Sequence, residues 1–405
     1  MNLLFLAPRL PLPPDTGAKI RTWNILKQLA KRFKVTLVCF SFEKNDNELV
    51  VRLENIGIQV KLVSAPQPMI FEKIILVLFN SIPYSIAKYS SSKMAQALSL
   101  LDVTNEYDAV HIDHLHMVHY RGIFHDVPAV LDEHNVEYRI LERCADVEKS
   151  ILKRKVFREQ AQKMKRFEAH AAKNFSACLT VSQDDRVTLS KITNGTVPVH
   201  VAPNGVDTEL FQTTDQRLET KDQSDESLVF TGSMDWFPND DAVIYFCNEI
   251  LPLIWQRNKN IKFYVVGKGP SAKIVQMGKE DSRIIVTGLV DDVRPYMERA
   301  QVYVVPLRIG GGTRLKILEA MSMEKAVVST TLGAEGIDYR KNFNIAIADT
   351  PQEFADRVIH LMNHPQEAKQ LGVEGRKLVC GKYDWNIIGE KLAEVYKEAT
   401  DGFKK

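Results

Sequence analysis

Cysteine is scarce in this sequence, and the five that occur are scattered. Cys39, Cys144, Cys178, Cys247 and Cys380 lie far apart, are odd in number and include no C-x-x-C pair. This spacing argues against a zinc site and against a disulfide framework. Isolated cysteines with mostly apolar flanks suit a reducing compartment, so we expect a cytoplasmic protein.

Long apolar runs and an excess of one charge sign are missing as well. The nearest approach to a membrane span is residues 69–86, where charged residues and a proline interrupt the run. Residues 1–8 lack a basic leader and are too short for a signal peptide, so a buried first strand is the better interpretation. With 53 basic and 51 acidic residues the net charge is +2, so no nucleic-acid partner is expected.

Short apolar runs alternate with helical patterns along the whole chain. The expected strands are 3–7, 35–40, 109–112, 129–132, 177–181 and 199–202, and after a polar linker at 212–227 they are 228–231, 262–266, 284–287, 302–305 and 326–329. Such alternation predicts parallel sheets that helices cover on both faces. We therefore expect two doubly wound α/β domains, over 1–206 and 207–382, that face each other across a cleft.

A glycine-rich loop gives the strongest chemical signal. Gly310, Gly311 and Gly312 follow an expected strand and precede an expected helix, for which Thr313 is the predicted N-cap. Glycines let backbone N–H groups come close to a ligand, and the N–H groups of a helix start bind anions. The plainer alternative is a glycine-rich loop beside a surface ion pair, but the context favours a phosphate site.

Three charged residues follow this loop. Arg314 and Lys316 stand in the first helical turn, where the helix dipole disfavours positive charge unless an anion is bound. Glu319 shares a helix face with Lys316 and could accept hydrogen bonds from a sugar diol. Because no D-x-D triplet occurs, we expect cations and helix dipoles to stabilise a departing diphosphate without a metal.

Two other patterns suggest a cofactor or a metal but have plainer explanations. Residues 267–272 match the dinucleotide fingerprint G-x-G-x-x-A, yet the acid required after the next strand is missing, so a strand-end turn is favoured over NAD. Histidines at 111, 114, 116 and 119 have a metal-like spacing. They begin on a strand and continue into a helix, so they need not converge.

Features of the first half point to ligands less strongly. His134 closes an expected strand, where contact with a donor or acceptor is favoured over a packed or capping role. Gly17 begins the first helix, where it either lets the helix start approach a diphosphate or belongs to an ordinary cap. The basic helix 149–166 is most simply a solvated face, and attraction to anionic lipid is the sharper alternative.

Several segments together resemble one known family over nearly the whole chain. They are Val201-Ala-Pro-Asn-Gly-Val-Asp207 with Phe211, then 265–270, 286–293, 317–322 and 326–330. They are similar to the GT-B glycosyltransferases, specifically glycosyltransferase family 4, also described as glycosyl transferases group 1. The resemblance implies two Rossmann-like domains and a final helix, 383–405, that packs back on the first domain.

The resemblance also implies roles for individual residues. Glu319 matches the second glutamate of the E-x7-E motif of the family and would contact the ribose, and the backbone at Leu289 and Val290 would hold the base. His134 would lie near the transferred sugar, and Gly17 near the diphosphate. The sequence departs from the family in two places. Gly311 replaces the first glutamate, and the region opened by Gly232 and Ser233, taken as donor contacts, lacks the basic residues that the family often carries there. We infer that Arg314 and Lys316 take over the diphosphate.

The expected function is therefore a metal-independent, retaining transfer of a sugar from a nucleotide-diphosphate sugar, the co-substrate, to an acceptor hydroxyl. The acceptor would be a glycan or a lipid-linked glycan, which leaves peripheral membrane contact open, and no separate cofactor is expected. A nucleotide-sugar epimerase on the same fold is one alternative. A sugar-nucleotide-binding protein without catalysis is another, because of Gly311.

Overall fold

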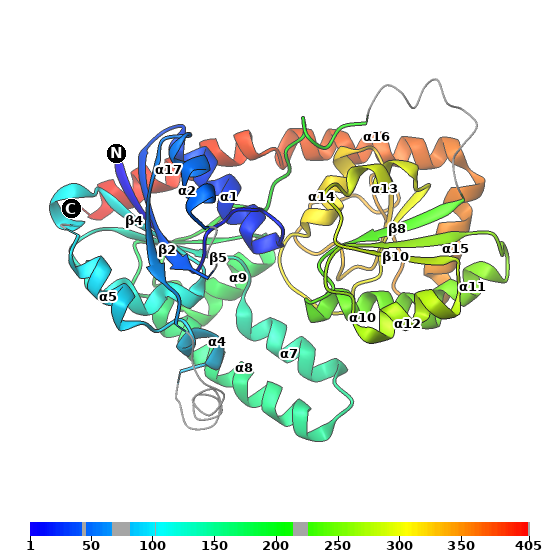
Figure 1. Ribbon diagram of the computed structural model, residues 1–405, viewed down its shortest axis with the longest axis horizontal. Coiled ribbons are helices and arrows are strands. Elements are labelled where there is room, and N and C mark those ends of the chain that lie inside the picture. The colour runs from blue at the N-terminus through cyan, green and yellow to red at the C-terminus, as the bar shows by residue number, and fades with distance from the viewer. Residues whose placement is uncertain (43–45, 67–81, 102, 214–225, 404–405) are drawn as a thin grey trace. The chain divides into compact units, whose positions relative to one another are not determined.

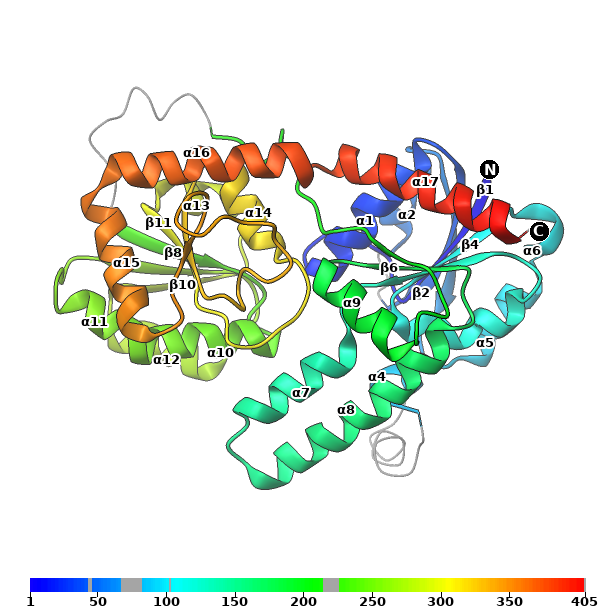
Figure 2. The ribbon, with the colours of Figure 1, turned by 180° about the vertical axis from the view of Figure 1, so that it is seen from behind.

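The chain folds into two compact units. The computed structural model describes residues 1–42, 46–66, 82–101, 103–213 and 226–403. Unit 1 consists of Met1–Pro203 and Trp385–Lys405, and unit 2 of Asn204–Asp384. Most of the predicted linker 212–227 and of the apolar segment 69–86 lies outside the described residues. Each unit has one parallel sheet with helices on both faces (Figures 1 and 2), which confirms the predicted doubly wound fold.

Unit 1 contains a seven-stranded sheet in the order β3-β2-β1-β4-β5-β6-β7. The strands are β1 Asn2–Ala7, β2 Lys34–Ser41, β3 Ile58–Ser64, β4 Ala109–Asp113, β5 Ala129–Glu133, β6 Ala177–Thr180 and β7 Val199–Val201. The helices are α1 Gly17–Ala30, α2 Asp46–Glu54, α4 Tyr84–Ala87, α5 Ser92–Ser99, α6 Val103–Glu106, the 3-10 helix η1 Leu115–Phe124, α7 Glu137–Val147, α8 Ile151–Ala172, α9 Gln183–Ile192 and α17 Trp385–Phe403.

Unit 2 contains a six-stranded sheet in the order β10-β9-β8-β11-β12-β13. The strands are β8 Ser227–Thr231, β9 Lys262–Val266, β10 Ile284–Gly288, β11 Val302–Val305, β12 Ala326–Ser329 and β13 Ala346–Ile347. The helices are α10 Phe237–Tyr245, the π-helix η3 Phe246–Ile250, α11 Leu251–Trp255, α12 Ala272–Glu280, α13 Arg294–Arg299, α14 Leu315–Ser322, α15 Pro351–Asn363 and α16 Pro365–Lys382.

The central strands form because both of their faces are buried. All five residues of β1 from Leu3 to Ala7 are inaccessible to solvent, and β8 and β11 are buried along their full length. Each fully buried leucine or phenylalanine contributes about 1.5–3 kcal/mol relative to exposure. These continuous apolar runs fix the middle of each sheet and therefore the edge at which its strands end.

The C-terminal helix α17 packs within unit 1. A Cβ atom on Gly389 would lie 2.7 Å from Oε1 of Gln28 in α1, so the two helices approach closely at that glycine. Tyr396 is fully buried, and its hydroxyl bonds to Nδ1 of His111 in β4. Helix α17 thus contacts both a helix and a central strand of unit 1. Within the described residues, no helix combines the length and the apolar character that a membrane crossing needs.

Candidate active site

The predicted donor residues of unit 2, apart from Glu319 in α14, lie on loops at one edge of its sheet. Gly232 follows β8, Leu289 follows β10, and the loop 306–313 follows β11. These strands run parallel, so their carboxyl ends meet at the same edge, where ligands bind in open α/β sheets. Leu289 is 73% exposed there, whereas Val290 packs partly against the core.

The glycine loop needs its glycines for geometric reasons. Gly310 and Gly312 have φ values of 132° and 68°, which side-chain-bearing residues rarely adopt. A Cβ atom on Gly310 would also lie 2.7 Å from Nη2 of Arg314. The loop therefore folds tightly around the guanidinium that follows it in the sequence.

Thr313 is not the N-cap of the following helix, so that prediction is wrong. Helix α14 begins at Leu315, its N-cap residue is Arg314, and no side chain caps it. The Thr313 hydroxyl instead donates to the carbonyl of Gly336 at 3.2 Å. The Thr313 carbonyl accepts a hydrogen bond of 2.8 Å from Nδ2 of Asn204. The side chain is thus engaged by the loop at 336, and the first N–H groups of α14 are left without a side-chain cap.

Arg314 and Lys316 are both held close to the glycine loops. Nη1 of Arg314 donates to the carbonyls of Gly311 and Gly312, the latter at 3.0 Å. Nζ of Lys316 donates to Oδ1 of Asn239 at 2.9 Å and lies 3.8 Å from the ring centre of Phe230. Lys316 is thereby positioned by residues of β8 and α10 that are remote in sequence.

Gly232 leaves room for the lysine. A Cβ atom there would lie 2.7 Å from Nζ of Lys316, so only glycine permits this approach. Asn239, which accepts from Lys316, also donates to the carbonyl of Ser233 at 2.8 Å. The hydroxyl of Ser233 is buried and has no hydrogen-bond partner among the described residues. The structure therefore brings Gly232, Ser233 and Lys316 together.

In this cluster the pKa values of Lys316 and Glu319 are both shifted toward neutrality. Burial, and after it the neighbouring charge of Arg314, lowers the pKa of Lys316 to about 7, while Glu319 opposes the change. Burial raises the pKa of Glu319 to about 7, against the effect of Lys316. Two cations close together in a partly desolvated place repel each other, and a bound anion would relieve that repulsion.

The pattern at 267–272 is used for packing. A Cβ atom on Gly267 would lie 2.0 Å from the carbonyl oxygen of Gly232, and one on Gly269 would lie 3.0 Å from Cβ of Asp235. These two glycines therefore let the loops after β8 and β9 touch. Ser271 caps α12 through the backbone N–H of Ile274. The glycines of this turn shape the sheet edge from within.

His134 of unit 1 belongs to a buried polar network. Its Nε2 lies 2.8 Å from Oδ1 of Asp113, and its Nδ1 is buried without a hydrogen-bond partner among the described residues. Asp113 also accepts from the Thr22 hydroxyl at 2.8 Å. Burial would raise the pKa of Asp113, but His134 and His111 hold it well below its usual range. His134 is thus oriented by a carboxylate that stays ionised.

Helix α1 anchors this network. Arg21 donates from Nε and Nη2 to the two carboxylate oxygens of Asp132, at 3.0 and 2.6 Å, and both side chains are buried. Asp113 is the last residue of β4 and Asp132 the next-to-last residue of β5, so α1 holds the carboxyl ends of both strands. Gly17 is the first residue of α1, and the Thr16 hydroxyl caps the helix through Lys19 N at 3.4 Å. Contact of Gly17 with a diphosphate stays a prediction.

The histidines with metal-like spacing do not form one cluster. His111 stacks on Phe5 and bonds to Tyr396, whereas His114 and His116 stack on each other with ring centres 3.8 Å apart. His111, Asp113 and Asp132 do place one ligand atom each within 4.8 Å of one another. Each of these three is already engaged by a neighbour, and the Arg21 guanidinium on Asp132 is unfavourable to a cation.

Glu137 is a site candidate that the sequence did not reveal, and His114, noted there only for its metal-like spacing, is another. The ring centre of His114 lies 4.8 Å from that of His134, and its Nε2 is 3.8 Å from Oε1 of Glu137. Its φ of 76° is unusual for a residue with a side chain. Burial lowers the pKa of His114 to about 3 and raises that of Glu137 to about 7. In the sequence, the cluster of histidines after β4 is the one feature that points to this part of unit 1.

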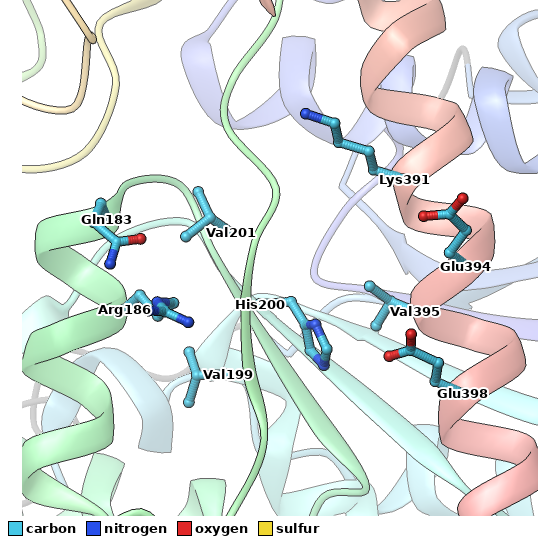
Figure 3. A pocket seen from close by; sticks show the side chains of 9 residues that line it. All are labelled: Gln183, Arg186, Val199, His200, Val201, Lys391, Glu394, Val395 and Glu398. Atoms are coloured by element: carbon cyan, nitrogen blue, oxygen red, sulfur yellow. The ribbon is translucent and has the colours of Figure 1, made fainter.

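Two hollows lie away from the predicted catalytic side chains. One, of about 410 Å³, is formed in unit 1 by α9, β7 and α17, with Arg186, His200 and Glu394 among its lining residues (Figure 3). The other, of about 370 Å³, lies in unit 2 beside α12 and β10 and ends at Thr287 and Gly288, next to the predicted base contact. None of the predicted catalytic residues lines either hollow.

Solved structures share this fold along the whole chain. A sucrose-phosphate synthase from Thermosynechococcus elongatus superposes with a TM-score of 0.74 at 16% identity, covering 99% of this chain and 100% of the other. Anabaena Alr3699/HepE in complex with UDP-glucose superposes with a TM-score of 0.70 at 15% identity, covering 98% and 99%. The fold is therefore that of the GT-B glycosyltransferases.

Sequence comparison identifies the family. The model described as Glycosyltransferase Family 4 matches residues 16–210, and that described as Glycosyl transferases group 1 matches residues 225–364. Together they span most of the chain, which belongs to the group 1, family 4 glycosyltransferases.

Curated relatives match this chain over shorter segments. A phosphatidyl-myo-inositol mannosyltransferase of Mycobacterium tuberculosis is 26% identical over 204 residues, 48% of this chain and 53% of the relative. An uncharacterized 44.6 kDa protein in the cps region of Klebsiella pneumoniae is 22% identical over 180 residues, 42% and 45% of the two chains. The chain thus matches about half the length of these relatives.

Proposed function

We propose that this protein is a retaining glycosyltransferase that moves a sugar from a nucleotide-diphosphate sugar to an acceptor hydroxyl without a metal ion. Membership of a glycosyltransferase family supports the reaction class. Retention of the anomeric configuration rests on the family resemblance. The observation that supports this assignment most is the pair of cations at the start of α14, held by hydrogen bonds beside the glycine-rich loops.

Glycosyl transfer requires stabilisation of the departing nucleotide diphosphate. The bond between the anomeric carbon and the diphosphate oxygen breaks, and its electron pair stays on the diphosphate. The acceptor oxygen bonds to the anomeric carbon, and the proton of its hydroxyl passes to the departing diphosphate. Negative charge grows on the departing diphosphate. Arg314, Lys316 and the uncapped N–H groups of α14 are the groups that would stabilise it, and such preorganised donors act strongly where water is excluded. They replace a divalent ion in this role.

The other proposed donor contacts come from residues near the same edge of the sheet of unit 2. Glu319 would accept hydrogen bonds from the ribose, and the backbone at Leu289 and Val290 would hold the base. Gly310 to Thr313 would bring the backbone of the loop against the diphosphate. In unit 1, His134 would contact the transferred sugar or assist the acceptor, with Asp113 fixing its ring.

We further propose that the acceptor is a glycan or a lipid-linked glycan. The support is the mannosyltransferase among the relatives, whose name specifies a phosphatidylinositol acceptor, and the Klebsiella relative from a cps region. These names describe those proteins, and their matched segments cover about half of each. The base and the sugar of the donor are to be found by experiment.

The test begins with a panel of nucleotide sugars, in which binding is detected as a rise in melting temperature. The donor that binds is then incubated with and without a membrane extract as acceptor source, with EDTA present throughout. We expect transfer into the extract with retained anomeric configuration, slow hydrolysis without it, and turnover at saturating donor lowered about 100-fold by Arg314→Ala. Lys369→Met, an exposed lysine of unit 2, is the control and leaves turnover unchanged.

Other outcomes separate the alternatives. An altered nucleotide sugar formed without acceptor would identify an epimerase. Tight donor binding with neither hydrolysis nor transfer would identify a binding protein without catalysis. Loss of activity in EDTA that Mg²⁺ restores would contradict the metal-independent mechanism.

A further inference from the structure

Helices α7 and α8 form an antiparallel pair within unit 1. Figures 1 and 2 show the turn between them at the end of the pair away from the sheet. Hydrogen bonds fix this turn: the guanidinium of Arg154 donates to the carbonyl of Glu148 at 2.8 and 3.0 Å, and Ser150 N donates to the Glu148 carboxylate at 2.8 Å. We call residues 148–158, the turn and the first two turns of α8, the hairpin tip.

The hairpin tip exposes large apolar side chains side by side. Ile151 and Leu152 are 82% and 74% exposed, and Val156, one helical turn after Leu152, is 42% exposed. Single exposed apolar residues are normal on a protein surface. Three exposed apolar residues within six positions, in a helix whose first turn faces solvent, form a patch that favours contact with an apolar environment.

The hairpin tip is also strongly basic. It contains five basic residues and one acid, Glu148, in eleven positions. The lysines are Lys149, Lys153 and Lys155, all exposed and without an ion pair among the described residues. This local excess contrasts with the near-neutral chain as a whole.

Other residues of α8 face inward and pack within unit 1. Ala161, Met164 and Glu168 are buried, and the Glu168 carboxylate accepts hydrogen bonds from the first backbone N–H groups of α7, at Glu137 (2.6 Å) and Tyr138. At helical spacing this face leads to Phe157 and Arg154. Leu152, Lys155 and Val156 therefore lie on the outward face, which packing within unit 1 does not explain.

We propose that the hairpin tip docks on an anionic lipid bilayer. Apolar side chains between lysines at the end of a rigid helix pair suit insertion into the headgroup region, while the lysines contact anionic headgroups. A second copy of the chain is disfavoured as occupant, because a symmetric contact would bring the same basic residues together. A protein partner would need a surface of about 800 Å² with matching shape, whereas a bilayer accepts a convex tip.

The experiment measures cosedimentation of the full chain with vesicles. One vesicle preparation is phosphatidylcholine alone, and the other contains about one third phosphatidylglycerol. We expect binding to the anionic vesicles only, weakened as salt rises from about 0.1 M to about 0.5 M. Replacing Lys149, Lys153 and Lys155 together by Gln should weaken binding about 100-fold, or about fivefold for each lysine. Ile151→Ser with Leu152→Ser should weaken it at least about tenfold.

Matched controls change similar residues elsewhere on unit 1. Lys34→Gln, Lys93→Gln and Lys191→Gln together remove three exposed lysines, and Leu100→Ser replaces a side chain that is 80% exposed. These variants should bind like the unaltered chain, and all variants should retain its melting temperature within a few degrees.

Three outcomes overturn the proposal: no binding to anionic vesicles, equal loss in the control and tip variants, or concentration-dependent dimerisation that Ile151→Ser with Leu152→Ser abolishes. Binding is measured without donor or acceptor. Its failure therefore leaves the transferase assignment intact, and failure of that assignment leaves the docking test unaffected.

Discussion

The affinity of the protein for its nucleotide sugar should fall as pH rises, because of Lys316. In the free protein, burial and the charge of Arg314 lower its pKa to about 7 from an ordinary value of 10.5. A bound diphosphate favours the charged amine, so the pKa in the complex returns toward its ordinary value. Below pH 7 the lysine is already protonated and binding takes up no proton. Above pH 7 the ligand must recruit one, and its affinity weakens.

The magnitude follows from the protonated fraction of the free protein. That fraction is about 0.9 at pH 6 and about 0.03 at pH 8.5 for a pKa of about 7. The dissociation constant should therefore rise about 30-fold over this range, equivalent to about 2 kcal/mol. The intact nucleotide sugar is the ligand to use, because its diphosphate does not titrate between these pH values.

Calorimetry in two buffers of different ionisation enthalpy measures the affinity and the proton uptake together. We expect uptake of about half a proton at pH 7 and nearly one at pH 8.5. Lys316→Arg keeps its charge throughout and should bind with little pH dependence, whereas Glu319→Gln should retain most of the dependence. An unaltered chain whose affinity is equal at pH 6 and 8.5 would refute the reasoning, as would a Lys316→Arg variant that keeps the 30-fold change.

Three further predictions concern the supports of the site. Arg21→Ala removes the guanidinium that pairs with the buried carboxylate of Asp132 and should lower the free energy of unfolding by about 3–5 kcal/mol in a urea titration. A loss below about 1 kcal/mol would contradict a buried ion pair there. Gly267→Ala puts a methyl group 2.0 Å from a backbone carbonyl oxygen and should lower the free energy of unfolding by more than about 3 kcal/mol. Gly122→Ala, which has open space around the added methyl group, should change it by no more than about 0.5 kcal/mol. Equal losses in the two variants would show that the loops after β8 and β9 do not touch. His134→Ala should lower turnover about 100-fold with donor affinity preserved, and the reverse pattern, weak binding with normal turnover, would argue against its placement at the sugar.

The buried strands could be predicted from sequence because both of their faces are apolar. The predicted strands 262–266, 302–305 and 326–329 coincide with β9, β11 and β12. The two missed strands, β3 and β13, lie at sheet edges. β3 exposes Gln59 and Lys61 on its open side, and β13 is only two residues long, so neither carries a continuous apolar run.

The supports of the site could not be predicted, since they depend on contacts between distant residues. Arg21 reaches Asp132 across 111 positions, and Lys316 reaches Asn239 across 77. Local propensity carries no information about such pairs. Thr313 shows the same limit at short range: it suits an N-cap, but the carbonyl of Gly336 takes its hydroxyl and the helix starts two residues later.

The central claim is that the start of α14 grips the donor diphosphate. A crystal structure of the full chain with the nucleotide sugar that binds in the panel tests it most directly. We expect diphosphate oxygens within about 3 Å of Nζ of Lys316 and of the backbone N–H groups of the 310–316 segment. A diphosphate bound elsewhere, with Lys316 still donating to Asn239, would contradict it.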